Sequence, residues 1–182
     1  MNKFTLTPND TSLLVIDFQE KLVPAMHRTE DTVKNAGILM EIAKALEIPI
    51  IVTEQYPKGI GHTVAPLSGL FGELSPIEKM TFSACTKEVE DQLSKEPRQK
   101  ILISGIEAHV CVFQTVRALL QKDYQVYVVS DAVSSRTEAN YQNGLSQMRE
   151  MGAVITNTET VLFDLLKEST HPKFKELSKL IR

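Results

Sequence analysis

Five short apolar runs, separated by stretches with helical periodicity, constrain the fold of this chain more than any other feature. The runs hold consecutive β-branched and other apolar residues, as strands buried on both faces of a sheet do; they cover residues 12–17, 48–53, 100–105, 125–131 and 152–157. A weaker sixth run covers residues 75–80. Apolar residues recur at helical spacing in 30–47, 87–95, 110–121 and 137–151, and two closing helices are expected at 160–166 and 172–181.

The alternation of strand and helix predicts an α/β fold with a parallel sheet and helical crossovers. A chain of 182 residues is long enough for one domain with a large core and too short for two ordinary domains. Residues 1–182 are therefore expected to form a single domain. The stretch from Glu54 to Leu74 shows neither pattern, and a loop of that length is typical of a functional segment.

The charge and the chain start exclude several classes of partner. A formal charge of −3, a sequence pI near 5.8 and no cluster of Lys or Arg argue against a nucleic-acid partner. The first ten residues lack the apolar core of a signal peptide, and no apolar stretch approaches the roughly 18 residues that span a bilayer. We expect a soluble, cytoplasmic protein with no membrane partner.

The two cysteines, Cys85 and Cys111, give little support for a disulfide framework or a metal site. Two cysteines make no disulfide framework, and without a CxxC pair or a compact Cys/His cluster a zinc site has little support. The glycines of "GIGH" (59–62) lack the spacing of a dinucleotide-binding loop. We expect reduced thiols, no metal and no cofactor.

An acid, a lysine and a thiol stand where predicted strands end, which is where open parallel sheets bind ligands. Asp17 ends the first strand, Lys79 ends the weak one, and Cys111 follows the fourth within "GIEAHVC". A helix that starts near His109 would place Cys111 in its first turn, where the helix dipole favours a thiolate. Desolvation would raise the pKa of Asp17 and allow it to take the thiol proton, while Lys79 orients the carboxylate.

Each of these residues also has an ordinary structural interpretation. A single cysteine in a buried α/β core is more often inert, and Cys85 keeps that interpretation. A lone Asp at a strand end is more often a turn residue, and a lone Lys after a strand is usually solvated. Only the three residues together favour catalysis.

The sequence resembles the isochorismatase-like cysteine hydrolases, a superfamily that also holds nicotinamidases and carbamoyl-sarcosine amidohydrolases. The resemblance covers about residues 12–156 and rests on "LLVIDFQ", "IEKMTFSA" and "SGIEAHVCV" in the family's order and spacing. "TEQYPKGIG", "DAVSSR" and "HPKFKELSKLI" are similar to the isochorismatase-domain-containing subgroup found in animals.

The resemblance implies a six-stranded, mostly parallel sheet with helices on both faces, a Rossmann-like three-layer sandwich. It implies a catalytic triad of Asp17, Lys79 and Cys111, and a cis peptide between Ile106 and Glu107. The backbone N–H groups of Glu107 and Cys111 would then form the oxyanion hole. The implied reaction is attack of the thiolate on a carbonyl-like carbon, departure of an amine or ammonia, and hydrolysis of the thioester, with Asp17 moving the proton in both halves.

Departures from the family pattern narrow the expected activity. Nicotinamidases carry an Asp-x-His and a further His as metal ligands after the second strand, whereas this chain has Glu54-Gln55-Tyr56 with only His62 nearby. One carboxylate and one histidine are too few ligands for a tight divalent site, which disfavours a nicotinamidase. Isochorismatases of siderophore pathways often lack the cysteine, so its presence here favours thiol-dependent hydrolysis.

A substrate pocket is expected around the three strand ends. Its candidate apolar wall is Phe18, Leu22, Tyr56 and Phe82, and its candidate polar contacts are Gln55, Ser83 and Glu107. The same residues also suit ordinary loop and core positions. We expect a small neutral or cationic amide as substrate, although the bond type and the leaving group are not written in a single sequence.

Two other classes of function stay open. One is a binding or scaffold protein that kept the fold and lost the activity. The other is a redox or electrophile sensor in which Cys85 resolves Cys111. His109 is a candidate local acid, although a helix-start position explains it equally, and Arg136 is expected to brace its loop or a subunit contact. A homo-oligomer, a dimer or larger, is expected through apolar residues of 137–151 and the closing segments.

Overall fold

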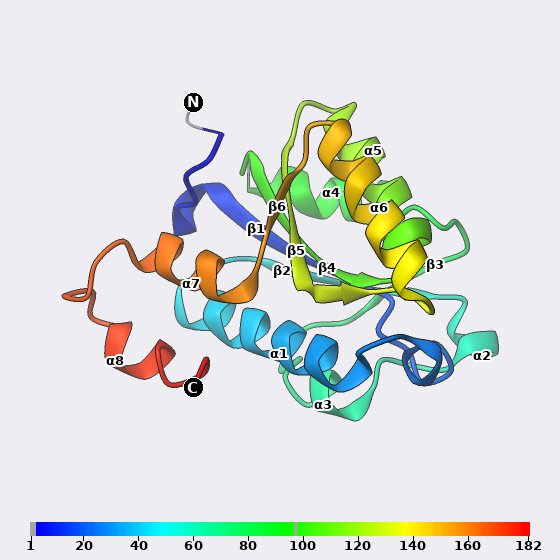
Figure 1. The fold of residues 1–182 in the computed structure, drawn as a ribbon, viewed down its shortest axis with the longest axis horizontal. Coiled ribbons are helices and arrows are strands. Elements are labelled where there is room, and N and C mark those ends of the chain that lie inside the picture. Colours follow the sequence, from blue (N-terminus) through cyan, green and yellow to red (C-terminus); the bar gives the residue numbers. More distant parts are fainter. Residues whose placement is uncertain (1–2, 97) are drawn as a thin grey trace.

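The computed structural model describes residues 3–96 and 98–182 and contains one six-stranded sheet (Figure 1). The strand order is β3-β2-β1-β4-β5-β6, and every neighbouring pair is parallel. The strands are β1 (Thr11–Ile16), β2 (Ile50–Gln55), β3 (Ile77–Lys79), β4 (Lys100–Ile106), β5 (Gln125–Ser134) and β6 (Val154–Thr156). The expected α/β class and the six-stranded sheet are confirmed.

Helices cover both faces of the sheet, as the three-layer expectation requires (Figure 1). One face packs α1 (Thr29–Ala45), α3 (Ala65–Ser68), α7 (Thr158–Leu166) and α8 (Phe174–Leu177) into a first apolar cluster. The other face packs α4 (Lys87–Lys95), α5 (Phe113–Leu120) and α6 (Glu138–Glu150) into a second cluster. The remaining helix, α2 (Pro57–Ile60), follows β2. Among the described residues, none of the helices is both long and apolar enough to cross a membrane.

Three helices begin at the polar residues that their sequences place there. The side chains of Thr86, Thr137 and Asn157 accept hydrogen bonds from the backbone N–H groups three residues later, at the starts of α4, α6 and α7. Such caps provide acceptors for N–H groups that have no partner within the helix. Each cap typically stabilises the protein by about 1 kcal/mol. The local sequence therefore determines where these helices start.

Two expected segments differ from the structure. The stretch 54–74 is no structureless loop, because it forms α2 and α3 and buries Leu67 completely in the first cluster. The expected helix at 172–181 is reduced to α8, since the chain continues in turns that lay Leu180 and Ile181 against the core. Packing of these apolar side chains outweighs continuation of the helix.

The apolar side chains of α6 face the chain's own core. Tyr141, Leu145 and Met148 belong to the second cluster, so they do not form the subunit contact that was expected of helix 137–151. Leu177 of the closing segment is likewise buried, in the first cluster. The apolar stripe of helix 137–151 is thus used by the sheet, whereas Phe163 in the closing segment 160–166 is exposed, and a subunit contact there stays a prediction.

Candidate active site

The centre of the sheet is a topological switch point. β1 leads through α1 to β2 on one side, whereas β4, its other neighbour, leads through α5 to β5 on the opposite side. Crevices at the carboxyl ends of such strands are the usual ligand sites of open α/β sheets. Asp17 directly follows β1, and the turn that carries Cys111 directly follows β4.

A close approach of β1 and β4 brings these two ends together. Gly105 has φ +158°, and a Cβ at this position would lie 2.6 Å from Ile16 Cβ and 2.7 Å from the Ile16 carbonyl oxygen. Only glycine allows the two backbones this separation. The chain then turns sharply at Asp17, whose φ of 57° lies in the left-handed region that Asp tolerates better than most residues.

The Asp17 carboxylate is fully buried and fully hydrogen-bonded. Its Oδ1 accepts from Thr53 Oγ1 at 2.8 Å, and its Oδ2 accepts from Lys79 Nζ at 2.6 Å. The Cys111 thiol also interacts with this carboxylate. Burial raises the pKa of Asp17, although the bonds from Lys79, Thr53 and Cys111 act against the rise. The direction is the one predicted, and a raised pKa suits a general base.

Lys79 reaches across β2 to Asp17, and its ammonium group has no exposed side-chain surface. Besides Asp17, Nζ lies within hydrogen-bond distance of Gln55 Oε1 at 2.8 Å and of the carbonyl oxygens of Thr81 and Phe82 at 3.1 Å each. A buried ammonium needs such compensation for its lost hydration. Lys79 is therefore the charged partner of Asp17, and these bonds fix the position of its ammonium group.

Cys111 lies in a π-helical turn, Ala108–Val112, that precedes α5. Its side chain is buried within the second cluster. The Cys111 carbonyl accepts a 2.6 Å bond from Thr115 Oγ1, and a Cβ on Gly144 of α6 would lie 3.1 Å from the backbone of Ala108. These contacts with α5 and α6 fix the position of the turn, and therefore restrict the position of the Cys111 sulfur.

The resting thiol is protonated, contrary to the thiolate predicted from the helix start. Burial raises the pKa of Cys111 to about 12, and the charge of Asp17 adds to the rise while Lys79 opposes it. Lost hydration and the neighbouring carboxylate outweigh the first-turn dipole. Chemically, the arrangement can generate a nucleophile only when Asp17 takes the thiol proton.

Glu107 stands between β4 and the π-helical turn. The peptide bond from Ile106 to Glu107 is cis, and the Glu107 carbonyl accepts bonds from Val110 N and Val112 N. Its carboxylate receives Arg136 Nε at 2.9 Å and Nη2 at 2.7 Å. The Glu107 side chain predicted to contact substrate is therefore paired within the protein.

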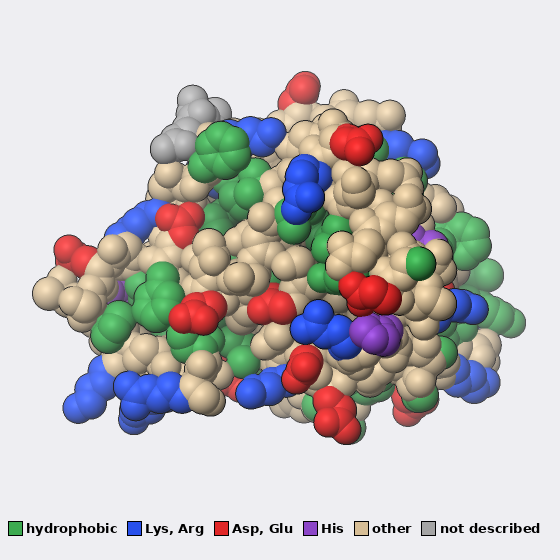
Figure 2. All heavy atoms as spheres, viewed as in Figure 1, with side chains coloured by type: hydrophobic (Ala, Val, Ile, Leu, Met, Phe, Trp, Pro, Cys, Tyr) green, Lys and Arg blue, Asp and Glu red, His purple; other side chains and the backbone are tan. Residues whose placement is uncertain are grey.

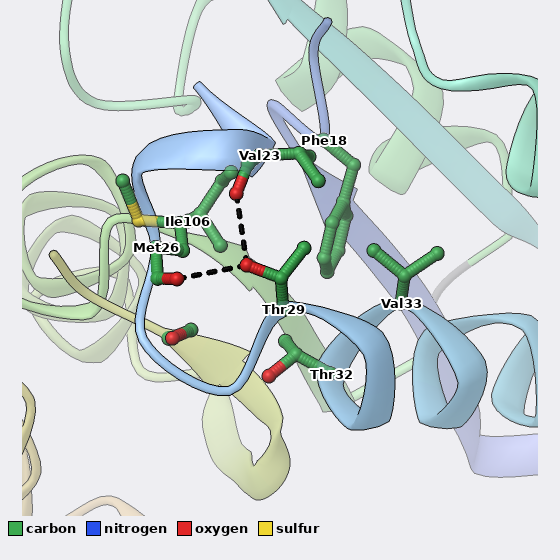
Figure 3. Close-up of a pocket in the computed structure, with 8 residues that line it drawn as sticks. Phe18, Val23, Met26, Thr29, Thr32, Val33 and Ile106 are labelled. Carbon is green, nitrogen blue, oxygen red and sulfur yellow. Dashed lines mark hydrogen bonds between the residues drawn. The ribbon is translucent and has the colours of Figure 1, made fainter. Parts of the chain in front are cut away.

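The structure does not bring all of the candidate pocket residues to Cys111. Phe18 and Leu22 pack in the first cluster, on the α1 face, whereas Cys111 belongs to the second. Phe18 lies against Val23 and Val33 beside a gap too narrow to admit a water molecule (Figure 3). These two side chains are not brought to the sulfur, because the chain turn at the end of β1 directs them to the opposite face.

Gln55 is brought to the catalytic candidates, but as a partner of Lys79. Its Nε2 also donates to the Met80 carbonyl at 2.9 Å. Tyr56 and Phe82 are exposed beside this group, at 45% and 55%. Ser83 is half-buried, and its Oγ accepts from Cys85 N at 3.2 Å.

Sequence reasoning missed two buried residues that hold the site together. Thr53 is the last residue of the apolar run 48–53, and its hydroxyl fixes one oxygen of Asp17. Gln19, which lies just after β1, ties the chain there to the end of β2. Its Nε2 donates to the Gln55 carbonyl at 2.9 Å, and its Oε1 accepts from Gln55 N at 2.6 Å. The only signal was polarity: polar side chains within or beside apolar runs need partners.

Glu54 and His62, the two residues weighed as metal ligands from the sequence, belong to an internal hydrogen-bond network. Glu54 Oε1 accepts from Thr63 N at 2.7 Å and from Thr63 Oγ1 at 2.8 Å, while Oε2 lies 3.0 Å from His62 Nδ1. The carboxylate thereby pins the segment after α2. Across the described ranges 3–96 and 98–182, no group of three or more His, Cys, Asp or Glu is arranged to hold a metal.

Cys85 has the environment of an inert thiol. Burial raises its pKa to about 11, and Sγ lies 3.8 Å from the Thr115 carbonyl. Redox-sensing cysteines have lowered pKa values, whereas the pKa values of Cys85 and Cys111 are both raised. The sensor alternative loses support.

Comparisons with known proteins are consistent across sequence and structure. A family model described as the isochorismatase domain matches residues 11–160. Isochorismatase domain-containing protein 2 of Xenopus laevis is 42% identical over 170 residues, which are 93% of this chain and 82% of that protein. A solved structure from Caenorhabditis elegans, named MAR1 ribonuclease, is 41% identical with a TM-score of 0.93 and covers 97% of this chain and 92% of its own.

A more distant solved structure shows the fold alone. An Escherichia coli protein, described as an octameric hydrolase of unknown specificity, has a TM-score of 0.91 at 22% identity. The match covers 98% of this chain and 89% of the other. The arrangement of strands and helices is thus shared far beyond the range of sequence identity.

Proposed function

This chain belongs to the isochorismatase family of hydrolases, and from that premise we propose that it is a cysteine-dependent hydrolase of a small molecule's amide-like C–N bond. One observation carries the proposal. The buried Asp17 carboxylate is hydrogen-bonded to Lys79 and to Thr53, and it interacts with the Cys111 thiol. A carboxylate that is buried, oriented and in contact with a thiol is the minimum machinery for thiol-based acyl transfer.

The proposed acylation begins with proton transfer from Cys111 Sγ to Asp17. The sulfur attacks the carbonyl carbon, and the resulting oxyanion accepts hydrogen bonds from the backbone N–H groups of Glu107 and Cys111. The C–N bond then breaks, the amine leaves with the proton from Asp17, and a thioester remains on Cys111. Lys79 keeps Asp17 in place and stabilises its charged form.

Deacylation repeats these roles with water. Asp17 takes a proton from water as the water oxygen attacks the thioester carbon. The Cys111 thiolate then leaves and recovers the proton from Asp17. The products are a carboxylic acid and an amine or ammonia. No metal or cofactor takes part in these steps, and Glu54 and His62, committed to the loop after α2, are not offered as metal ligands.

A small neutral or cationic amide is the proposed substrate. The charged side chains at the strand ends are paired with one another: Lys79 with Asp17, and Arg136 with Glu107. No unpaired cation among these four is left to bind an anionic substrate. Thiol catalysis requires reduced cysteines, which supports the proposed cytoplasmic location.

Assembly into a dimer or larger ring is also proposed. Exposed apolar side chains of Tyr56, Met80 and Phe82 lie near the end of β3, and Figure 2 shows hydrophobic side chains gathered along that side of the molecule. Size-exclusion chromatography with light scattering tests this. An unchanged monomer mass over a wide concentration range would contradict it.

RNA cleavage is the second candidate, because the Caenorhabditis elegans relative is named a ribonuclease. The charge of this chain gives it little support. Basic and acidic side chains are interspersed over the face drawn in Figure 2, apart from a small basic group over α8, and the formal net charge is −3. A nucleic-acid partner therefore remains the less favoured proposal.

Acyl-enzyme trapping tests the function. The full-length protein is mixed with a panel of small p-nitroanilides and p-nitrophenyl esters with neutral, cationic or anionic acyl groups, and intact and peptide mass spectrometry locate any acyl adduct. We expect an adduct on Cys111 that is absent in Cys111→Ser and unchanged in Cys85→Ser. Asp17→Asn should slow acylation by about 10²–10⁴-fold, the usual contribution of a general base.

The same preparation is incubated with a single-stranded RNA. RNA cleavage lost in Cys111→Ser, without any acyl adduct, would favour the ribonuclease alternative. An unreactive Cys111 without RNA cleavage would favour the scaffold alternative. Turnover confined to anionic substrates would overturn the proposed substrate class and leave the mechanism standing.

A further inference from the structure

We infer that Arg136 is a positioning residue of this site, which supports the reactivity of Cys111 by cancelling the negative charge of Glu107. The inference rests on the proposed function, because it concerns the same thiol. Arg136 follows the end of β5, while Glu107 follows the end of β4, so the pair joins the two loops that border the candidate site.

The ion pair has the geometry of a specific interaction. Two nitrogen atoms of the guanidinium group, Nε and Nη2, donate to the two carboxylate oxygens, and the Arg136 backbone N–H lies 3.3 Å from Oε2. Bidentate pairs of this kind fix orientation as well as charge. The Glu107 side chain is only 9% exposed, whereas Arg136 is 58% exposed. A nearly buried carboxylate is thus neutralised from the solvent side.

The charge of Glu107 acts on the nucleophile. The charges that act on the Cys111 thiol are those of Asp17 and Lys79, at the ends of β1 and β3, and of Glu107, which directly precedes the π-helical turn. Both carboxylates oppose formation of a thiolate, and Lys79 favours it. His109, on the same turn, acts on Glu107 in the same sense as Arg136. Without Arg136, a second uncompensated carboxylate would oppose the developing negative charge on sulfur.

The loop that carries Arg136 has other attachments. Ser135 Oγ lies 3.0 Å from His109 Nδ1, and the Ser135 carbonyl accepts from His27 N at 2.8 Å. Ser134 Oγ also bonds to the His27 carbonyl. The position of this loop is therefore held by several bonds besides the ion pair, so a substitution at Arg136 changes charge more than it changes the fold.

The test compares Arg136→Gln, Glu107→Gln, the double variant and Arg136→Lys. The rate constant for iodoacetamide labelling of Cys111 is measured by peptide mass spectrometry from pH 6 to 10, with Cys85 as the reference thiol in each sample. Urea unfolding midpoints are recorded for every variant. The reagent is uncharged, so its approach does not depend on the charge at Arg136.

Charge cancellation predicts a specific pattern. Arg136→Gln should slow Cys111 labelling by about tenfold, the equivalent of one pKa unit, with Cys85 unchanged. Glu107→Gln should label at least as fast as the wild type. The double variant should recover the wild-type rate, because it lacks both charges, and Arg136→Lys should recover most of it.

Two outcomes would overturn the inference. In one, Arg136→Gln labels at the wild-type rate; in the other, the double variant stays as slow as Arg136→Gln, which would mean that Arg136 acts only by gripping the loop. Acyl-enzyme trapping separates this inference from the proposed function. If an acyl adduct forms on Cys111 and Arg136→Gln labels at the wild-type rate, only the inference fails; if Arg136→Gln labels at the wild-type rate and no acyl adduct forms, both fail.

Discussion

Replacement of Lys79 by methionine tests the electrostatic core of the site. Both side chains of the Lys79–Asp17 pair are completely buried, with Nζ and Oδ2 2.6 Å apart. Methionine fills the space of the lysine stem and removes only the charge and its hydrogen bonds. In Lys79→Met the Asp17 carboxylate keeps its bond from Thr53 but loses its counter-charge.

The magnitude follows from this burial. Loss of one partner of a buried ion pair costs about 3–5 kcal/mol, because the other charge stays desolvated and unpaired. The free energy of unfolding of a small domain is about 5–15 kcal/mol, so the variant should still fold. Asp17→Asn in the same background removes the unpaired charge and should recover most of the loss.

The pH dependence gives a second, independent prediction. Burial raises the pKa of Asp17 in the folded protein, and removal of Lys79 raises it further. A raised folded-state pKa means that stability is retained below the ordinary carboxyl pKa and lost as pH rises through the folded-state value. Relative to the double variant, Lys79→Met should lose stability with rising pH, by no more than about 1.4 kcal/mol per pH unit.

Urea unfolding followed by circular dichroism at pH 5, 6.5 and 8 measures both effects. Lys87→Met is the matched control, since Lys87 pairs with Asp91 on the surface and its side chain is 82% exposed; its unfolding midpoint should not change. A loss below about 1 kcal/mol in Lys79→Met, or a loss independent of pH, would refute a charged, buried pair.

Three further predictions concern neighbouring parts of the site. Gly144→Ala should slow acylation of Cys111, measured by mass spectrometry, because its Cβ would lie 3.1 Å from the Ala108 backbone and displace the nucleophile turn. Thr53→Val should lower the free energy of unfolding, from urea titration, by about 1.5–3 kcal/mol, since Asp17 loses a buried bond. The hydrogen bonds of Glu54 outweigh its burial and lower its pKa, so the stability it contributes should be present above the ordinary carboxyl pKa and lost as pH falls through the lowered value; acid titration of Glu54→Gln should lack this step.

The strands and the order of the site residues could be predicted from the sequence for a local reason. A strand covered on both faces needs consecutive apolar side chains, and β1 is buried at all six positions. Parallel strands align their carboxyl ends, so Asp17, Lys79 and Cys111 were expected at one edge of the sheet. The structure joins Lys79 to Asp17 and Asp17 to Cys111.

The functional partners of these residues could not be predicted, because they come from distant segments. Thr53 donates a hydrogen bond to Asp17, 36 positions away in the sequence, and Arg136 donates one to Glu107, 29 positions away. No periodicity links such pairs. Which face Phe18 enters was equally open, since a single residue after a strand can turn to either side.

The sequence by itself determined the α/β class, the strand positions and the places of Asp17, Lys79 and Cys111 at or just after strand ends, because these follow from local patterns of burial and from chain order. Only the tertiary structure decided that the Cys111 thiol rests protonated, that Gln55 holds Lys79 and that Glu107 is paired with Arg136. Burial and hydrogen bonding set these properties, and both depend on what the whole fold packs around a group.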